Sequence, residues 1–205
     1  MPTPERTSLD AIVVAGRDLL ETQGLDGLRG LTMQAVADRV GVRAPSLYKR
    51  VRNRRELVAL IADATVRELG ERLDAAAAGE PDPQRALAAL AREARSFARE
   101  RPVAFGLVFT PGADLDLDPE SLARASAAVI RIAAELAGED RALDAARTVT
   151  AWLNGFVGME LSGAFRLGGE VDRAFEFGIE SLTGALTLRR WAAPGAPLAI
   201  SVSEH

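Results

Sequence analysis

Apolar side chains recur every three or four positions along most of this 205-residue chain. This spacing places them on one face of a helix, whereas a half-buried strand would alternate every two residues. The first such run extends from Leu9 to Leu20, with Ser8 suited to be its N-cap and Gly24 its stop. Strand-like alternation is nearly absent, and no long-period repeat is present. The sequence therefore predicts an all-α fold of about nine helices.

Helix-start and helix-stop residues divide the rest of the chain. Thr32 and Asn53 precede two apolar-periodic runs as N-caps, and the short segment "APSLYKRV" between them predicts another helix. The stretch "GEPDP" (79–83) ends the long helix that follows Asn53. Later helices are expected at about 84–100, 102–109, 119–137, 140–166 and 171–190.

Composition excludes several kinds of chemistry. The chain has no cysteine, and its one histidine is His205, the last residue. Disulfide bonds, thiolate catalysis, cysteine-based metal sites and an internal catalytic imidazole are therefore excluded. The aspartates of "DLDLD" (114–118) lack the glycine and terminal Glu of an EF-hand loop, so a solvated loop is expected there. Because no nucleophile has an adjacent base, we predict a protein that is not an enzyme and needs no metal or cofactor.

Charge divides the chain into two unequal parts. Residues 1–55 carry 10 basic and 6 acidic side chains and residues 56–205 carry 15 and 23, so balances of +4 and −8 give the net charge of −4. Six basic residues and no acidic one lie between Arg43 and Arg55 in "GVRAPSLYKRVRNRREL" (41–57). Such a concentration of positive charge in an acidic protein favours contact with a polyanion.

The same stretch has the pattern of a helix-turn-helix. Two short helices meet at a turn containing Gly41, which supplies the positive φ that the turn needs. Pro45 is tolerated in the first turn of the second helix, and the small Ala44 and Ser46 would let this helix approach base edges. Four further side chains are within reach of phosphates: Tyr48, Lys49, Arg50 and Arg54. Taken singly, each of these residues could equally be a cap, a packed ring or a solvated side chain.

The segment "LTMQAVADRVGVRAPSLYKRVRNRRELV", after an amphipathic helix with "LLETQGLDGL", resembles the DNA-binding domain of TetR-type transcriptional regulators over about residues 8–62. The resemblance implies DNA contacts by Thr32, Gln34, Arg43, Ala44, Pro45, Ser46, Tyr48, Lys49 and Arg50, and a phosphate contact by Arg54. Ala44 replaces a polar residue of similar family members, and Lys49-Arg50 replace an aromatic-histidine pair. A different operator is therefore expected, with Arg43, Gln34 and Lys49 as the base-contacting residues.

Regulators of this type act as twofold dimers, which places their recognition helices one DNA turn apart. The helix expected at 171–190 carries four large apolar residues at three- and four-residue steps, with small residues beside them: Phe175, Ile179, Leu182 and Leu186. The resemblance favours a four-helix dimer interface built from this helix and the preceding one of each subunit. The alternative is that these four residues form a core face within one chain.

The stretch "TVTAWLNGFVGMELSGAF" (148–165) is the most distinctive part of the C-terminal half. It resembles the tryptophan/glycine motif in the ligand domain of one TetR subgroup, with Asn154 where a histidine often precedes the glycine. Aromatic residues make up only 5% of the chain, yet they gather here and at 97–109, which favours an apolar pocket. The expected ligand-binding residues are Phe97, Phe105, Phe109, Trp152, Asn154, Phe156 and Met159. Core packing is the alternative for each aromatic residue.

These observations predict two domains and a tail. Residues 1–55 are expected to form a three-helix helix-turn-helix DNA-binding domain. Residues 56–190 are expected to form a helical ligand-binding and dimerisation domain that begins with a connecting helix at 56–78. Residues 191–205 are expected to be a flexible tail.

The predicted function is that of a ligand-responsive, sequence-specific DNA-binding transcriptional regulator. We expect a repressor that a small, largely apolar effector releases from a palindromic double-stranded DNA operator. No secretory signal is recognised, and no apolar run approaches the ~20 residues that a membrane-spanning helix needs. A cytoplasmic homodimer with no membrane partner is therefore expected. A constitutive regulator with a solid core and a small helical enzyme acting on an apolar substrate are the alternatives.

Overall fold

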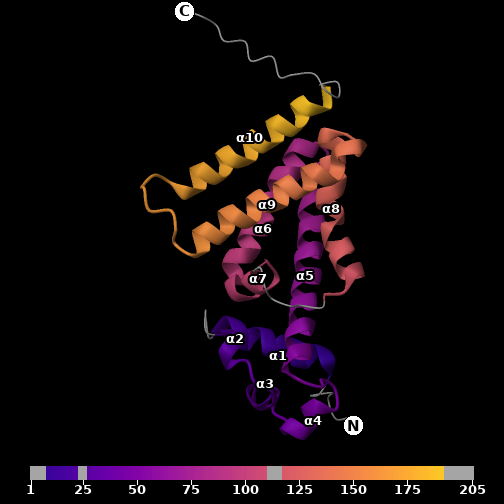
Figure 1. The fold of residues 1–205 in the computed structure, drawn as a ribbon, viewed down its shortest axis with the longest axis vertical. Helices are drawn as coiled ribbons and strands as arrows, with labels where there is room; N and C mark the ends of the chain where they lie inside the picture. The colour runs from indigo at the N-terminus through magenta and orange to yellow at the C-terminus, as the bar shows by residue number, and fades with distance from the viewer. Residues whose placement is uncertain (1–7, 23–26, 110–116, 192–205) are drawn as a thin grey trace, which may run out of the picture.

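The computed structural model describes residues 8–22, 27–109 and 117–191, and every regular element in them is a helix (Figure 1). The first five are α1 (Leu9–Thr22), the single turn α2 (Gly27–Gly30), α3 (Met33–Val40), α4 (Ala44–Tyr48) and the long α5 (Arg54–Ala78). They are followed by α6 (Pro83–Glu100), α7 (Pro102–Phe109), α8 (Pro119–Ala137), α9 (Ala142–Leu161) and α10 (Val171–Trp191). The predicted all-α fold of about nine helices is confirmed.

Helices α1 to α4 form a small lobe around the first turns of α5 (Figure 1). Its core contains Ile12, Leu20, Val36 and Leu47, all fully buried. The core continues along α5 as far as Ala62, so the hydrophobic contacts of this lobe extend beyond residue 55. Burial of this face, rather than the helix propensity of such short segments, stabilises α3 and α4.

The C-terminal lobe surrounds the rest of α5, which connects the two lobes (Figure 1). Phe97, Ile132 and Phe175 are among its fully buried side chains. Helices α5 and α8 approach closely at Gly70, where an added Cβ would lie 2.7 Å from the Cα of Ala125. The absence of a side chain at Gly70 therefore sets the spacing between these two helices.

Local capping bonds place the helix ends close to where the sequence predicts them. The side chains of Thr32 and Asn53 accept hydrogen bonds from backbone N–H groups in the first turns of α3 and α5. Helix α9 is shorter than expected, because Gly163 has φ +65° and the Ala164 N–H turns back to the Met159 carbonyl at 2.8 Å. The expected stop at Gly24 and the expected tail beyond Trp191 lie outside the described residues.

Candidate DNA-binding surface and ligand cavity

The helix-turn-helix consists of α3 and α4, and backbone hydrogen bonds fix its turn. Gly41 ends α3 with φ +79°, and the N–H groups of Gly41 and Val42 donate to the Ala37 carbonyl at 3.0 and 2.9 Å. Residues with a Cβ rarely adopt this φ, so glycine is favoured here. Leu47 anchors α4, because its side chain is fully buried in the N-terminal core. The other side of α4 consequently faces solvent.

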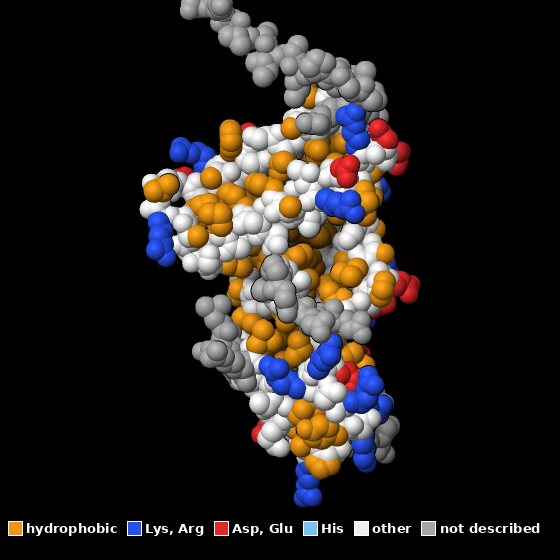
Figure 2. Space-filling view, viewed as in Figure 1, with side chains coloured by type: hydrophobic (Ala, Val, Ile, Leu, Met, Phe, Trp, Pro, Cys, Tyr) orange, Lys and Arg blue, Asp and Glu red, His pale blue; other side chains and the backbone are white. Residues whose placement is uncertain are grey.

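Three basic side chains border α4 without forming an ion pair in the described part of the chain. They are Arg43, at the N-cap position, and Lys49 and Arg50, directly after the helix, and all three are exposed. Figure 2 shows Lys and Arg side chains gathered at this end of the molecule with few acidic ones between them. These cations are available to an external anion such as a DNA phosphate or a base edge.

The other predicted residues of α4 differ in exposure, and Ala44 packs in part against the N-terminal core. Pro45 is exposed, Ala44 and Ser46 are half-buried, and the Tyr48 side chain is 53% exposed. Pro45 lies in the first turn of α4, where its missing N–H costs no intrahelical hydrogen bond. The side chains next to Arg43 are small, so a flat surface such as a groove edge can approach the helix.

On α3, both predicted DNA-contacting residues already form hydrogen bonds within the helix. The Thr32 hydroxyl accepts from the Ala35 N–H at 3.1 Å, and the Gln34 Nε2 donates to an Asp38 carboxylate oxygen at 2.7 Å. Both side chains are exposed. The carboxylate of Asp38 therefore orients the Gln34 amide. Gln34 can contact a base either in this orientation or after its hydrogen bond to Asp38 breaks.

Two arginines at the start of α5 have partners inside the protein. Arg52 Nε donates to Glu56 at 3.1 Å, and this pairing raises the pKa of Arg52 and lowers the pKa of Glu56. Arg54 Nε donates to the Leu31 carbonyl at 2.7 Å, and a second Arg54 nitrogen donates to the Leu28 carbonyl. The Arg54 guanidinium thus ties the segment before α3 to α5, and the phosphate contact of this exposed side chain stays a prediction.

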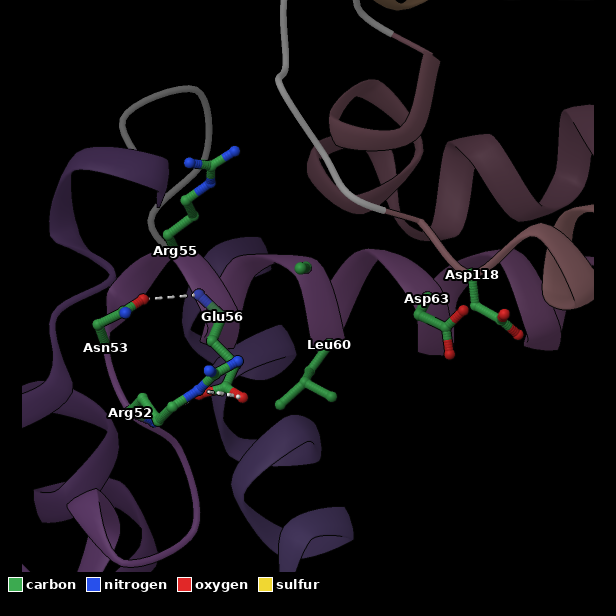
Figure 3. Close-up of a pocket in the computed structure, with 8 residues that line it drawn as sticks. Arg52, Asn53, Arg55, Glu56, Leu60, Asp63 and Asp118 are labelled. Carbon is green, nitrogen blue, oxygen red and sulfur yellow. Dashed lines mark hydrogen bonds and ion pairs between the residues drawn. The ribbon is translucent and has the colours of Figure 1, made fainter.

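An open hollow of about 420 Å³ lies beside the start of α5 (Figure 3). Arg52 and Glu56 meet at one end of it, and the Arg55 side chain points away from this pair. Asp63 of α5 and Asp118, which precedes α8, lie at the other end. The Asp118 carboxylate accepts from the N–H groups of α8, so it acts as a helix cap.

A second, largely apolar cavity of about 130 Å³ lies inside the C-terminal lobe. We call it the ligand cavity; five helices line it, and three predicted ligand residues, Phe105, Phe109 and Asn154, belong to its wall. The rings of Phe105 and Phe109 lie 4.6 Å apart at an interplanar angle of 40°. The other lining residues are Val66, Leu69, Leu73, Leu90, Ala94, Val108, Leu122, Ala125, Ser126, Val129, Thr150 and Leu153.

The other four predicted ligand residues are not among the lining residues of this cavity, so their contact with a ligand stays a prediction. Phe97 is fully buried, with the Arg72 guanidinium 5.2 Å from its ring centre. Trp152 and Phe156 face away from the ligand cavity and pack on Phe175 at 5.4 and 5.2 Å between ring centres. Met159 is 47% exposed. The physical reason is helical geometry: Trp152 and Asn154, two positions apart, lie on different sides of α9.

An ion-pair cluster between α6, α9 and α10 was not anticipated from the sequence. Arg95 is almost fully buried, lies 4.4 Å above the Phe175 ring, and donates to Glu160 at 2.6 Å and to Asp172 at 2.6 Å. Arg99 donates to the same two carboxylates. Hydrogen bonds from Arg95 and Arg99 lower the pKa of both carboxylic acids. Glu160 thus joins α9 to α6.

The residues predicted to form the dimer interface pack inside a single chain. Phe175, Ile179 and Leu186 are 0%, 4% and 7% exposed and belong to the C-terminal core, and Leu182 is half-buried. Their apolar surface is already covered, so little remains for a second chain. Phe175, Ile179 and Leu186 thus contribute to a core face within one chain, as the alternative expects, and the dimer contact of the four residues stays a prediction.

Helix α7 joins the two lobes. Phe105 belongs to the C-terminal core, whereas Leu107, two residues later, belongs to the N-terminal core. The Glu21 carboxylate of α1 accepts hydrogen bonds from the N–H groups of Val103 and Ala104, at 3.2 and 2.9 Å. A carboxylate at this position satisfies the unpaired N–H groups of the first helical turn and complements the helix dipole. The wall of the ligand cavity is thereby bound directly to the DNA-binding lobe.

Two predicted absences concern metals and membranes. The described residues contain no group of three or more potential metal-ligating side chains, and Asp114 and Asp116 of the "DLDLD" segment lie outside the described residues. Among the described helices, none combines the length and the apolar character needed to cross a membrane.

Comparison with known families and structures matches both lobes. Residues 12–61 match the family model "Bacterial regulatory proteins, tetR family", and residues 87–182 match "Tetracyclin repressor-like, C-terminal domain". No curated protein sequence matches the chain. Both matched domains are those of transcription regulators, which groups the chain with transcription factors and not with enzymes.

Solved structures with the same fold include several regulators. A regulatory protein named SCO4313 is 25% identical, with a TM-score of 0.72 over 89% of this chain and 100% of that one. A TetR family transcriptional regulator from Streptomyces coelicolor A3(2) is 21% identical, with a TM-score of 0.66 over 87% and 98%. A TetR variant from Acinetobacter baumannii AYE in complex with minocycline is 24% identical, with a TM-score of 0.65 over 90% and 99%.

Proposed function

We propose that this chain, which belongs to the tetR family of bacterial regulatory proteins, is a homodimeric, sequence-specific, ligand-responsive transcriptional repressor. A small, largely apolar molecule in the ligand cavity would release it from a palindromic operator. The observation that carries the DNA-binding part is the group of three exposed cations, Arg43, Lys49 and Arg50, around a helix anchored by one buried leucine.

Around α4, the three cations have distinct expected roles. Arg43 lies at the N-terminal end of the helix, the end that contacts base edges in helix-turn-helix proteins, and arginine pairs with guanine through two hydrogen bonds. Lys49 and Arg50 lie at the other end, where phosphates are the nearer anions. Lys49 is the second candidate for a base contact, and Gln34 is a third only if its bond to Asp38 is released.

The exposed sides of α9 and α10 support a dimer interface. Gly155 and Gly158 on α9 and Gly184 on α10 have no atom within 4 Å of an added Cβ. A glycine inside a helix costs about 1 kcal/mol relative to alanine, and no contact among the residues that the structure describes explains these three. Close approach by a helix of a second chain would explain them. Figure 2 shows apolar and uncharged surface over α9 and α10, with charged side chains around its margins.

The dimer proposal is tested by replacing Gly155 with leucine. An added Cβ at this exposed position has no described atom within 4 Å, and leucine improves helix propensity, so stability of the monomer should not fall. Sedimentation velocity should nevertheless show a shift from dimer to monomer. Ala127→Leu on the exposed side of α8 is the control and should leave the dimer unchanged. A Gly155→Leu protein that remains fully dimeric would move the interface away from α9.

Helix α7 provides the link between effector and operator. Because it contributes Phe105 and Phe109 to the ligand cavity and Leu107 to the N-terminal core, a molecule that displaces it must disturb the bonds of Glu21. Differential affinity for the two positions of α7 would then shift the dimer between DNA-binding and released states.

Selection of bound sequences from random DNA tests the function as a whole. We expect a palindrome whose half-site centres lie one helical turn apart, ~34–36 Å. The same selection with Arg43→Ala should relax one position per half-site and cost about 1–3 kcal/mol of discrimination there. A selection that recovers no palindrome would count against the dimeric operator, and an unchanged motif would assign base contact to residues other than Arg43.

A further inference from the structure

We propose that the ligand cavity selects a neutral molecule of about one six-membered ring that carries a single polar group, and that Asn154 recognises this group. The inference rests on the proposed function, in which this cavity is the effector site. It adds to the proposed function by specifying the charge, the size and the orientation of the effector. It also predicts that one side chain, Asn154, discriminates among similar molecules.

The neutral charge of the ligand is inferred from the side chains that line the cavity. Among the described lining residues there is no Asp, Glu, Lys, Arg or His. The Arg95 cluster belongs to the α6–α10 contact, and its charges are already compensated by Glu160 and Asp172. A charged group placed against this wall would lose part of its hydration and gain no counter-ion, whereas a neutral group avoids this penalty.

The orientation of the ligand is inferred from the positions of the polar side chains in the cavity wall. Thr150 and Asn154 are four residues apart on α9 and therefore share one side of the helix, and Ser126 on α8 is the third polar lining residue. These three are exposed or half-exposed, whereas Leu73, Leu90 and other apolar lining residues are buried. The cavity thus has an apolar inner end and a polar outer end.

Asn154 offers a ligand more hydrogen-bonding groups than the hydroxyl of Thr150 or Ser126 does. The Ser126 hydroxyl already donates to the Leu122 carbonyl at 2.8 Å. The side-chain amide of Asn154 makes no hydrogen bond with any residue that the structure describes. An amide offers both donors and an acceptor, so it can bind a hydroxyl or a carbonyl group of a neutral molecule. A site built for such a bond discriminates against an analogue that lacks the group.

The size of the ligand is inferred from the volume of the cavity. A cavity of about 130 Å³ is close to the roughly 150 Å³ of an engineered apolar cavity that binds benzene. The adjacent rings of Phe105 and Phe109 offer an aromatic wall against which a ring can pack edge-on or offset. A single ring with one short polar substituent therefore fills this space, with the ring inside and the substituent at Asn154.

Four probe compounds of similar size test the proposal by isothermal titration calorimetry on the full-length protein. Benzyl alcohol is neutral with a hydroxyl, ethylbenzene is neutral without one, and benzylamine and benzoate carry opposite charges. We expect benzyl alcohol to bind about tenfold more tightly than ethylbenzene, because one hydrogen bond is gained, and we expect neither ion to bind measurably. Tighter binding of either ion, or no binding of benzyl alcohol, would overturn the inference whatever the variant below does.

The variant Asn154→Leu keeps the side-chain size and removes the amide. We expect its preference for benzyl alcohol over ethylbenzene to disappear while ethylbenzene still binds. Gln84→Leu, the same kind of change at an exposed position of α6 outside the cavity, should keep the preference. A preference that survives in Asn154→Leu would exclude Asn154 as the recognising residue.

A parallel measurement separates this inference from the function on which it rests. Operator affinity is measured with and without benzyl alcohol. If the compound binds with the stated preference but operator affinity does not change, the selectivity holds and the effector role fails. If a charged or much larger molecule instead releases the operator by binding this cavity, the effector role holds and the stated selectivity fails.

Discussion

Arg50 and Arg52 should contribute differently to DNA affinity although they lie two residues apart. Arg50 is exposed and forms no ion pair in the described part of the chain, whereas Arg52 is bonded to Glu56 at 3.1 Å. From sequence alone, both are equal members of the basic stretch. The structure predicts that Arg50 neutralises a phosphate and that the Arg52–Glu56 pair does not.

The expected magnitude follows from counter-ion release. Each phosphate contact contributes about 0.9 to the slope of log affinity against log salt concentration. A dimer contains two copies of Arg50, so Arg50→Ala should reduce the slope by about 1.8. Between roughly 50 and 200 mM salt, a fourfold change, the wild-type protein should therefore lose about twelvefold more affinity than the variant. The control combines Arg52→Ala with Glu56→Gln, which removes one charge of each sign, and should leave the slope unchanged.

Fluorescence anisotropy with a random-sequence DNA duplex measures this slope, because the phosphate contribution does not depend on sequence. Titrations at several salt concentrations give one slope for each protein. The reasoning is refuted if the paired change at Arg52 and Glu56 reduces the slope as much as Arg50→Ala does. It is equally refuted if Arg50→Ala leaves the slope at its wild-type value.

Three further predictions concern stability and the contact between the lobes. Bonding to Arg95 lowers the pKa of Glu160 in the folded protein, so its contribution to stability is present above the ordinary pKa of 4.5 and is lost as the pH falls below it. Glu160→Gln should therefore lower the free energy of unfolding in urea by about 3 kcal/mol at neutral pH, a difference that shrinks in acid. Gly178→Ala places a Cβ 2.3 Å from the Trp152 ring, and this overpacking should lower the free energy of unfolding by about 1–3 kcal/mol. The better helix propensity of alanine offsets roughly 1 kcal/mol of that loss. The net effect should be measured as a lower denaturant midpoint. Glu21→Ala removes the cap of α7, so hydrogen exchange of the N–H groups in its first turn should accelerate, and unchanged exchange would deny the cap a role in holding the lobes together.

Local features could be predicted from the sequence because they depend on neighbouring residues. The N-caps Thr32 and Asn53 and the left-handed Gly41 are of this kind, since the helix-turn-helix geometry follows from bonds within a few residues. The exposed cations after α4 follow from the same short segment. The partners of Arg54 could not be predicted, because the Leu31 and Leu28 carbonyls lie 23 and 26 residues away in the sequence.

Features that depend on how helices pack against one another were beyond sequence reasoning. The aromatic residues of α9 seemed to form one group with those of α7, but Trp152 stacks on Phe175 whereas Asn154 faces the ligand cavity. The spacing of apolar residues on α10 is compatible with either a dimer contact or a core face. Only the burial of Phe175 in the structure assigns it to the core. Glycines inside a helix are visible in the sequence, and Gly155 marks a surface of α9 that no contact among the described residues explains.

The position of α7 in both cores also limits how the protein can diversify. A substitution at Phe105 that reshapes the ligand cavity acts on the same eight-residue helix that supplies Leu107 to the DNA-binding lobe. A substitution on α7 that changes effector specificity must therefore also preserve the contact of α7 with the DNA-binding lobe. Changes at Ser126 on α8 or Asn154 on α9 carry no such obligation, because neither residue belongs to the N-terminal core. Directed evolution of a biosensor from this protein should therefore accept substitutions at these two positions more often than on α7.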